Sequence, residues 1–145
     1  MTADRRRIAF LKRLARVRAI ERRQAAWQLA EARSTQARMF DLAARSRDLA
    51  ADYAVARPTA DAQSLLTLHS FRAQLSSMAG EAAQMGDAAE RGAEQAGVAL
   101  ARAEHRADTV NERIASEQQR VALRRVTRAQ LDASGLARRL QNQGE

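Results

Sequence analysis

The side chains that could carry out catalysis are few in this chain of 145 residues, and they form no clusters. His69 and His105 are the only histidines, and neither has a carboxylate cluster or a second metal ligand at a useful helical spacing. Glu90 and Glu94 share one helix face, but two helices packed together offer no cleft that would desolvate such a pair. The chain has no cysteine, which excludes a thiol nucleophile and a thiolate metal site. We therefore expect no enzymatic activity, no metal site and no cofactor.

Arginine is the residue type whose placement predicts a binding chemistry. Residues 1–23 contain 9 basic and 2 acidic side chains, residues 24–119 contain 10 and 13, and residues 120–145 contain 6 and 2. The two ends of the chain are therefore basic (+7 and +4), whereas the middle is slightly acidic (−3). An arginine fork binds carboxylates or phosphates, so this excess predicts an acidic partner, which could be protein, nucleic acid or anionic lipid. The candidate partner-binding residues are Arg5, Arg6, Arg7, Arg13, Arg16, Arg22, Arg23, Arg120, Arg124, Arg125 and Arg128.

Long helices must position these arginines, because the chain contains only one proline and six glycines and is rich in alanine, arginine and glutamate. The clearest break is at Pro58, which disfavours helical geometry in the residue before it. Thr59 or Asp61 can then cap a second helix. The next stop signal is "DASG", at residues 132–135. One domain, residues 1–145, is expected, with helix one at about 4–56, a turn at about 57–60, helix two at about 60–133 and a frayed tail at 134–145.

Heptad spacing predicts that the two helices form a coiled coil. In helix one the apolar seam is expected at Phe10, Leu14, Val17, Ile20 and Trp27, and then at Met39, Leu42, Ser46, Leu49 and Tyr53. In helix two it is expected at Phe71, Leu75, Met78, Ala82, Met85, Ala89, Gly92, Ala96 and Ala99, continuing through Ala103, Ala107, Val110, Ile114 and Val121. A tight turn makes the helices antiparallel and brings both chain ends to one basic end. The predicted fold is an all-α, long antiparallel two-helix coiled-coil hairpin with unequal arms. A compact three-helix bundle is the alternative, and it would need a second turn signal.

Four glycines interrupt the expected second helix, at positions 80, 86, 92 and 97. A pivot at Pro58 would pair residues whose numbers sum to about 116. This register places Trp27 near Ala89 and Gly92, so that a large side chain lies opposite small ones.

The start of the chain gives no sign of export or membrane insertion. Lys12, Arg13, Arg16 and Arg18 interrupt the apolar residues of the N-terminal segment, and the sequence has no apolar run of 18 residues. A cytoplasmic protein is therefore expected.

The chain resembles the FliJ family, small components of the flagellar type III protein export apparatus. The likeness rests on "LKRLARVRAIERRQAAWQLAEAR" (11–33), the single break at Pro58 and the arginine-rich "RIASEQQRVALRRVTRAQL" (113–131). The resemblance implies a stalk whose terminal coiled-coil end sits in the pore of the hexameric export ATPase. It also implies contacts with substrate chaperones and peripheral association with the membrane-bound export gate, without specific nucleic-acid binding.

Two other functions stay open at this point. One is a basic coiled coil that binds nucleic acid or associates with the nucleoid, as the arginine clusters would allow. The other is a protein that lies on a membrane surface through the amphipathic segment Ile8–Ile20. The acidic middle of the chain favours docking through the basic end over binding along the whole length.

Overall fold

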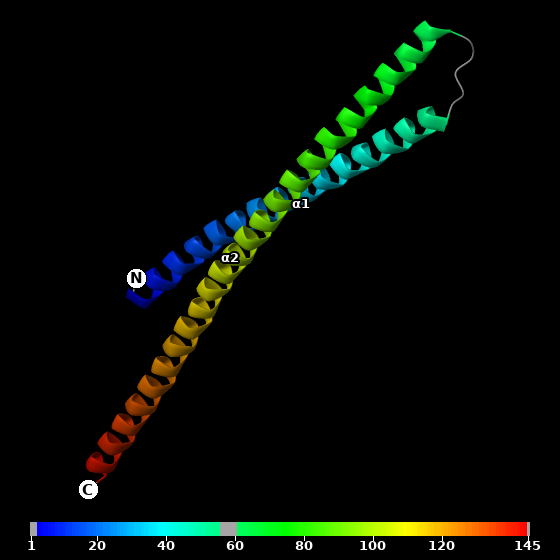
Figure 1. Cartoon of the computed structure of the whole chain (residues 1–145). Coiled ribbons are helices and arrows are strands. Elements are labelled where there is room, and N and C mark those ends of the chain that lie inside the picture. Colours follow the sequence, from blue (N-terminus) through cyan, green and yellow to red (C-terminus); the bar gives the residue numbers. More distant parts are fainter. Residues whose placement is uncertain (1–2, 56–60, 145) are drawn as a thin grey trace. The chain divides into compact units, whose positions relative to one another are not determined.

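The protein consists of two helices joined by a short connection (Figure 1). The computed structural model describes residues 3–55 and 61–144. Helix α1 spans Ala3–Val55 (53 residues) and helix α2 spans Ala62–Gln143 (82 residues), with no strand among the described residues. The chain is therefore an all-α, antiparallel two-helix hairpin with arms of unequal length, which confirms the predicted fold class. The predicted turn, with Pro58 and Thr59, lies outside the described residues.

Local chemistry explains where α2 begins and how far it continues. The amide of Gln63 donates to Oδ1 of Asp61 at 3.1 Å, so Asp61 is the N-cap of α2, one of the two caps expected. At its other end α2 continues to Gln143, ten residues beyond the predicted end at 133. Gly135 costs a helix only about 1 kcal/mol, and the leucines and arginines after it favour helix. The hydroxyl of Ser134 donates to the carbonyl of Gln130 inside the helix, so it does not terminate it.

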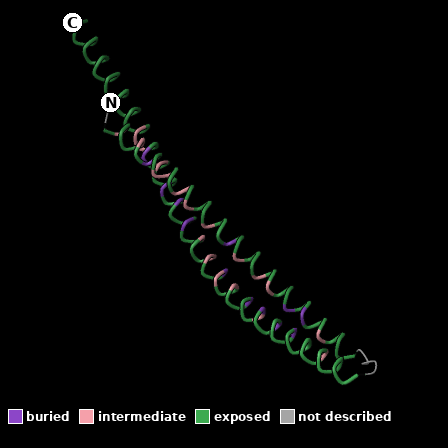
Figure 2. Tube along the Cα trace, turned by 90° about the horizontal axis from the view of Figure 1, so that it is seen from above, coloured by how far each residue is buried: buried purple, intermediate pink, exposed green. Residues whose placement is uncertain are grey.

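The contacts divide the chain into two compact units. Unit 1 comprises residues 1–22 and 102–145, and unit 2 comprises residues 23–101. In each unit a segment of α1 packs against an antiparallel segment of α2. Buried and partly buried residues recur at regular intervals along both helices (Figure 2).

The buried positions alternate at spacings of four and three residues, as a coiled-coil seam requires. In unit 1 the seam contains Asp4, Ile8, Leu11, Ala15 and Arg18 of α1, with Ala103, Ala107, Val110, Ile114, Glu117 and Val121 of α2. In unit 2 it contains Ala25, Leu29, Ala32, Gln36, Met39, Ala43, Ser46 and Ala50 of α1, with Leu75, Ala79, Ala82, Gly86, Ala89, Ala93, Ala96 and Leu100 of α2.

In unit 1 the predicted seam positions of α2, Ala103, Ala107, Val110, Ile114 and Val121, are confirmed, but in unit 2 several predicted positions are wrong by one residue. One predicted row of α2, from Leu75 through Ala82, Ala89 and Ala96, is confirmed, but Met78 and Met85 are exposed while their neighbours Ala79 and Gly86 are buried. In α1, Leu42 and Leu49 are likewise exposed, and Ala43 and Ala50 take their places. Small side chains let two helices approach closely, so the larger apolar side chains lie beside the seam.

The predicted register is also wrong. In unit 1, Asp4 pairs with Arg120 and Arg7 pairs with Glu117, so that each pair of numbers sums to 124. In unit 2 the rings of Tyr53 and Phe71 pack edge to face, with centroids 4.9 Å apart, again at a sum of 124. The predicted register assumed that residues at equal distances from Pro58 along the two helices lie opposite each other. The side-chain contacts select a register about eight residues higher.

The predicted contact between Trp27 and Gly92 therefore does not form. Trp27 is 66% exposed, and a Cβ placed on Gly92 would have no atom within 4 Å. Instead Gly86 makes room for a large side chain, because a Cβ there would lie 2.7 Å from Cε1 of Phe40. A large residue does face a glycine, but at a different pair of positions.

Candidate functional site

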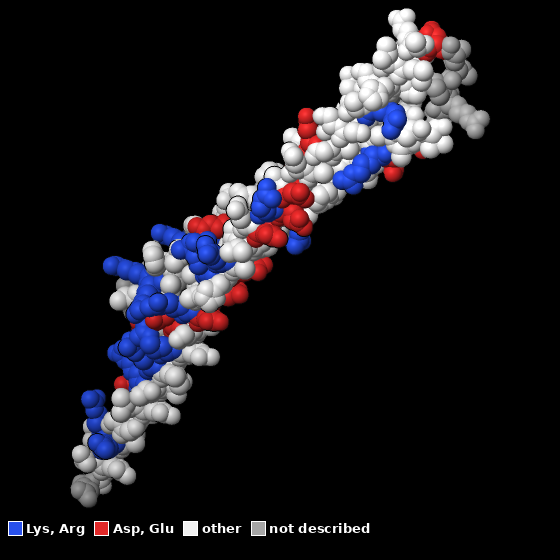
Figure 3. All heavy atoms as spheres, in the orientation of Figure 1, with Lys and Arg blue, Asp and Glu red and all other residues white. Residues whose placement is uncertain are grey.

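The basic side chains are concentrated in unit 1. This unit contains 17 basic and 8 acidic residues (+9), whereas unit 2 contains 8 and 9 (−1). Ten of the eleven candidate arginines belong to unit 1, and Arg23 belongs to unit 2. Lys and Arg side chains crowd the face drawn in Figure 3 over the segment that leads to the chain ends.

Two carboxylates in the seam of unit 1 hold three of these arginines. Nη2 of Arg120 donates to Oδ1 of Asp4 at 2.8 Å and to Oε2 of Glu117 at 2.6 Å. Nε of Arg7 lies 3.3 Å from Oε1 of Glu117, and Nη1 of Arg124 lies 3.5 Å from Oδ2 of Asp4. Glu117 is buried, and its pairing with two guanidinium groups satisfies a charge that would otherwise be costly in a seam. This ion-pair cluster joins the start of α1 to α2.

The same contacts shift two pKa values. The hydrogen bond from Arg120 lowers the pKa of Asp4 below its ordinary value of 3.8, and the charges of Arg120, Arg124 and Arg7 add to this effect. The pKa of Arg120 is raised, first by its hydrogen bond to Glu117 and then by the one to Asp4. Both shifts favour the charged forms of Asp4 and Arg120.

A groove lined by arginines lies beside the cluster, where α1 begins. Its volume is about 400 Å³. We call it the arginine groove, and its lining residues are Asp4, Arg5, Ile8, Val121, Arg124, Arg125 and Arg128. Arg5, Arg125 and Arg128 are exposed there, and forks of this kind bind carboxylates or phosphates in a bidentate manner. Four of the predicted site residues thus converge on one surface.

From residue 122 onward α2 buries no residue against the described part of α1, although Arg124, Arg125 and Arg128 in its first turns still line the groove. Asp4 lies at the start of α1 and pairs with Arg120, and every residue from 122 to 144 is exposed. Residues 122–143, which we call the bare segment, extend about 33 Å at 1.5 Å per residue. The bare segment contains its own heptad row of apolar side chains, offset by about one residue from the seam row of α2, namely Ala122, Val126, Ala129, Ala133, Leu136 and Leu140. Val126, Leu136 and Leu140 are 55–63% exposed.

The remaining candidate arginines do not join the groove. Arg6 and Arg13 lie beside Phe10 around a shallow hollow on α1, and Arg16 and Arg22 are exposed farther along the same helix. Phe10 is itself exposed, as are Val17 and Ile20, although all three were expected in the seam. The seam row passes instead through Ile8, Leu11 and Ala15, which leaves these three side chains on another side of α1.

Sequence reasoning missed the role of Asp4 and Glu117. Both occupy seam positions, where an apolar residue is the normal choice, and each lies opposite an arginine in the observed register. That signal can be read only once the register is known, because it depends on pairing across the two helices.

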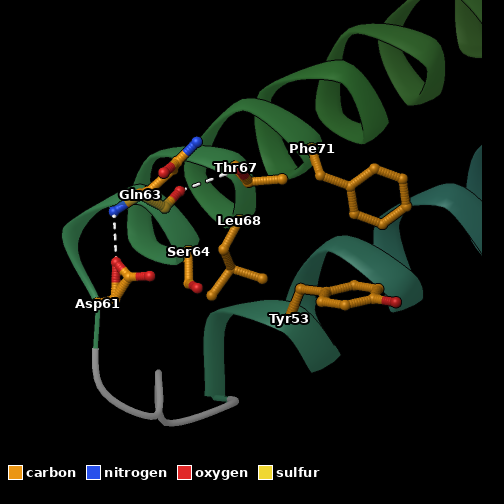
Figure 4. A pocket seen from close by; sticks show the side chains of 7 residues that line it. All are labelled: Tyr53, Asp61, Gln63, Ser64, Thr67, Leu68 and Phe71. Atoms are coloured by element: carbon orange, nitrogen blue, oxygen red, sulfur yellow. Dashed lines mark hydrogen bonds between the residues drawn. The ribbon is translucent and has the colours of Figure 1, made fainter.

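Unit 2 contains an open pocket of about 430 Å³ near the start of α2 (Figure 4). Tyr53 and Phe71 form one side, and Asp61, Gln63 and Thr67 line it from α2. Two of its polar groups serve the helix itself, since Asp61 caps α2 and the hydroxyl of Thr67 donates to the carbonyl of Gln63 at 3.0 Å. These groups do not converge on a point where a reacting atom could sit. Within the described residues no group of three or more His, Cys, Asp or Glu side chains could hold a metal ion.

Comparison with known proteins gives no relative: no protein-family model, no curated protein and no solved structure matches this chain. Along residues 3–55 and 61–144, neither helix has a stretch that is long and apolar enough to cross a membrane.

Proposed function

We propose that the chain is a non-enzymatic component of a flagellar or type III protein export apparatus, and that unit 1 docks end-on into the ring of the hexameric export ATPase. The observation that carries this proposal is the bare segment, a single helix with an exposed apolar row that extends past an arginine-lined groove. The resemblance to the FliJ family supplies the identity of the partner.

The bare segment needs a partner of a particular kind. Its heptad row is exposed among the described residues, so a partner chain could bury this apolar surface. Residues 122–143 contain five arginines and one aspartate, so pairing with a second copy would bring two segments of charge +4 together. An acidic partner is therefore favoured over self-association.

A ring suits the bare segment better than a single flat surface does. Every side of the helix is exposed from residue 122 to residue 144, so a pore can contact the apolar row and the arginines together. The arginine groove, at the base of the bare segment, would then meet carboxylates at the rim of the ring. The ion-pair cluster around Asp4 and Glu117 would keep the two helices joined at that rim.

Charge reversal in the groove tests this proposal. The experiment measures the affinity of the purified chain for the purified hexameric export ATPase of the same organism. The triple variant Arg124→Glu, Arg125→Glu and Arg128→Glu should weaken binding by at least about 30-fold, the effect of losing a single hot-spot residue of about 2 kcal/mol, a class in which arginine is enriched. The matched control changes three exposed arginines of unit 2 by the same charge, Arg38→Glu, Arg47→Glu and Arg72→Glu, and should change affinity less than threefold.

Circular dichroism should show that both triple variants remain helical. The proposal would be contradicted if both triple variants lost the same affinity for the ATPase, or if the native chain did not bind it. Mobility shifts on DNA and RNA at physiological salt address the nucleic-acid alternative. Tight and structure-selective binding that the groove variant abolishes would favour that function instead.

A further inference from the structure

The surface of α1 that faces away from the seam in unit 1 is strongly basic and carries exposed apolar side chains. Residues 5–20 contain seven basic residues and no acidic one. Phe10, Val17 and Ile20 are 64%, 50% and 54% exposed. At 3.6 residues per turn these three share a side of α1 opposite to the row of Ile8, Leu11 and Ala15 that packs on α2.

Cations and apolar groups are interleaved on this outer face, which we define as Arg6, Phe10, Arg13, Arg16, Val17 and Ile20. Arg6 and Arg13 line a shallow hollow of about 300 Å³ together with Phe10. The nearest carboxylates are already engaged, since Asp4 pairs with Arg120 and Arg124, and Glu21 with Arg18. The outer face therefore has an uncompensated positive charge around its apolar side chains.

We infer that the outer face of α1 binds an anionic lipid surface, with α1 lying parallel to the membrane plane. Guanidinium groups would pair with lipid phosphates, while Phe10, Val17 and Ile20 reach the boundary between head groups and acyl chains. The opposite side of α1 stays packed on α2, so only side-chain tips enter the lipid and neither helix has to rearrange.

Three features favour lipid over other acidic partners. Nucleic acid would pair with the arginines, and an unpaired base could stack on Phe10, but it would offer no apolar surface to bury Val17 and Ile20. A single acidic helix would contact a narrow stripe, whereas cations and apolar side chains alternate around this face. At 3.6 residues per turn Arg6 and Arg13 lie between Ile20 and Val17, and Arg16 lies beyond Ile20. A planar anionic surface meets all of these groups at once. This inference is independent of the proposed function, because the outer face excludes the groove residues Arg124, Arg125 and Arg128 and the whole bare segment.

Flotation of the full chain with lipid vesicles tests the inference. The native chain should bind vesicles of 30% phosphatidylglycerol in phosphatidylcholine and should not bind pure phosphatidylcholine. Arg6→Gln with Arg13→Gln should lower the partition coefficient about 25-fold, since each basic residue near an anionic surface contributes roughly a factor of five. Phe10→Ser with Ile20→Ser should lower it at least tenfold, because the inserted apolar area is lost.

Matched controls come from exposed residues of unit 2. Arg38→Gln with Arg47→Gln, and Leu65→Ser with Leu66→Ser, should each change partitioning less than twofold. Circular dichroism of every variant verifies folding. Failure of the native chain to bind anionic vesicles would overturn the inference, as would apolar variants that bind like the native chain. The inference would also be overturned if the unit 2 controls lost as much vesicle binding as the outer-face variants.

Two cross-measurements keep this inference separate from the proposed function. The outer-face variants should keep native affinity for the export ATPase. The groove variant, with reversed charge at Arg124, Arg125 and Arg128, is compared with the unit 2 variant that carries the same charge change. Its vesicle binding should be at least a third of that of the unit 2 variant. Loss of vesicle binding in the groove variant alone would place the lipid site in the groove and would overturn the assignment to the outer face.

Discussion

At the scale of single residues, Gly86 and Phe40 show how a seam built from small side chains accommodates a large one. A Cβ at Gly86 would lie 2.7 Å from Cε1 of Phe40, whereas a Cβ at Gly92 would meet nothing within 4 Å. The two glycines therefore have different roles, although they look alike in the sequence. Gly86 makes space for a ring, and Gly92 has no packing role that would exclude a side chain.

A double-mutant cycle should separate these roles. Gly92→Ala should stabilise the protein by about 0.5–1 kcal/mol, the usual gain from removing an interior glycine. Gly86→Ala should stabilise the protein less than Gly92→Ala does, or should destabilise it, because the Phe40 ring has to move. In a Phe40→Ala background the gain at position 86 should return, with a coupling energy of roughly 0.5 kcal/mol or more. Urea unfolding of the four proteins measures this, and identical effects at positions 86 and 92 in the native background would refute the assignment.

The pairing of Asp4 predicts how acid affects stability. Its pKa is lowered in the folded chain, chiefly by the hydrogen bond from Arg120, so the unfolded chain takes up this proton first as pH falls. The stability that Asp4 contributes is present in full above its ordinary pKa of 3.8 and is lost as pH drops through the lower folded value. Asp4→Asn should thus melt at a lower temperature than the native chain at neutral pH, and the two midpoints should converge in acid.

Thermal melts from about pH 7 down to about pH 2.5 test this expectation. Asp132→Asn is a suitable control, because Asp132 is exposed in the bare segment, and it should follow the native curve throughout. A constant difference between native and Asp4→Asn midpoints across the whole range would show that the side chain matters for reasons other than its charge.

At the scale of the helices, α2 combines a packed part with a part that has no partner. The bare segment contains no buried residue, so it should contribute helicity but little to global stability. Ending the chain after Val126 removes 17 of the 135 helical residues and keeps Arg124 beside Asp4. Ellipticity should fall by roughly an eighth, with the melting midpoint shifted by less than about 3 °C.

A deeper truncation serves as the comparison. Ending the chain after Asp108 also removes the seam residues Val110, Ile114 and Val121, and should lower the midpoint by more than about 10 °C. Equal effects of the two truncations would mean that the bare segment is packed against something in the free protein.

The helices could be predicted from the sequence, but their pairing could not. Composition and the break at Pro58 predicted two helices of unequal length, and Asp61 was one of the two caps expected. The register was wrong because a heptad pattern fits equally well after one helix slips by seven residues. The seam row was wrong because Leu42 and Met78 fit the heptad spacing as well as Ala43 and Ala79 do. The prediction assigned large apolar side chains to the seam, whereas the closely packed helices bury small ones there. The positions of Asp4 and Glu117 in the cluster depend on that register and were missed with it.

At the scale of the whole molecule, charge and exposed apolar surface occur together in unit 1. This unit has a net charge of +9 and contains the arginine groove, the bare segment and the outer face of α1. Ten of the eleven arginines that the sequence assigned to the basic end belong to it, because an antiparallel hairpin brings the chain ends together, whereas Arg23 belongs to unit 2. It could not predict which of them converge, since Arg5, Arg124, Arg125 and Arg128 meet across two helices while Arg16 and Arg22 do not.

Site-specific photo-cross-linking tests the central claim, that unit 1 enters the export ATPase ring, most directly. The native chain has no cysteine, so a benzophenone can be attached at one position through Ala133→Cys in the bare segment or Ser64→Cys in unit 2. With the purified hexameric ATPase, the label at position 133 should form an adduct with residues that line the pore, identified by mass spectrometry, and the label at position 64 should form none. An ATPase complex in which position 64 cross-links and position 133 does not would contradict the claim.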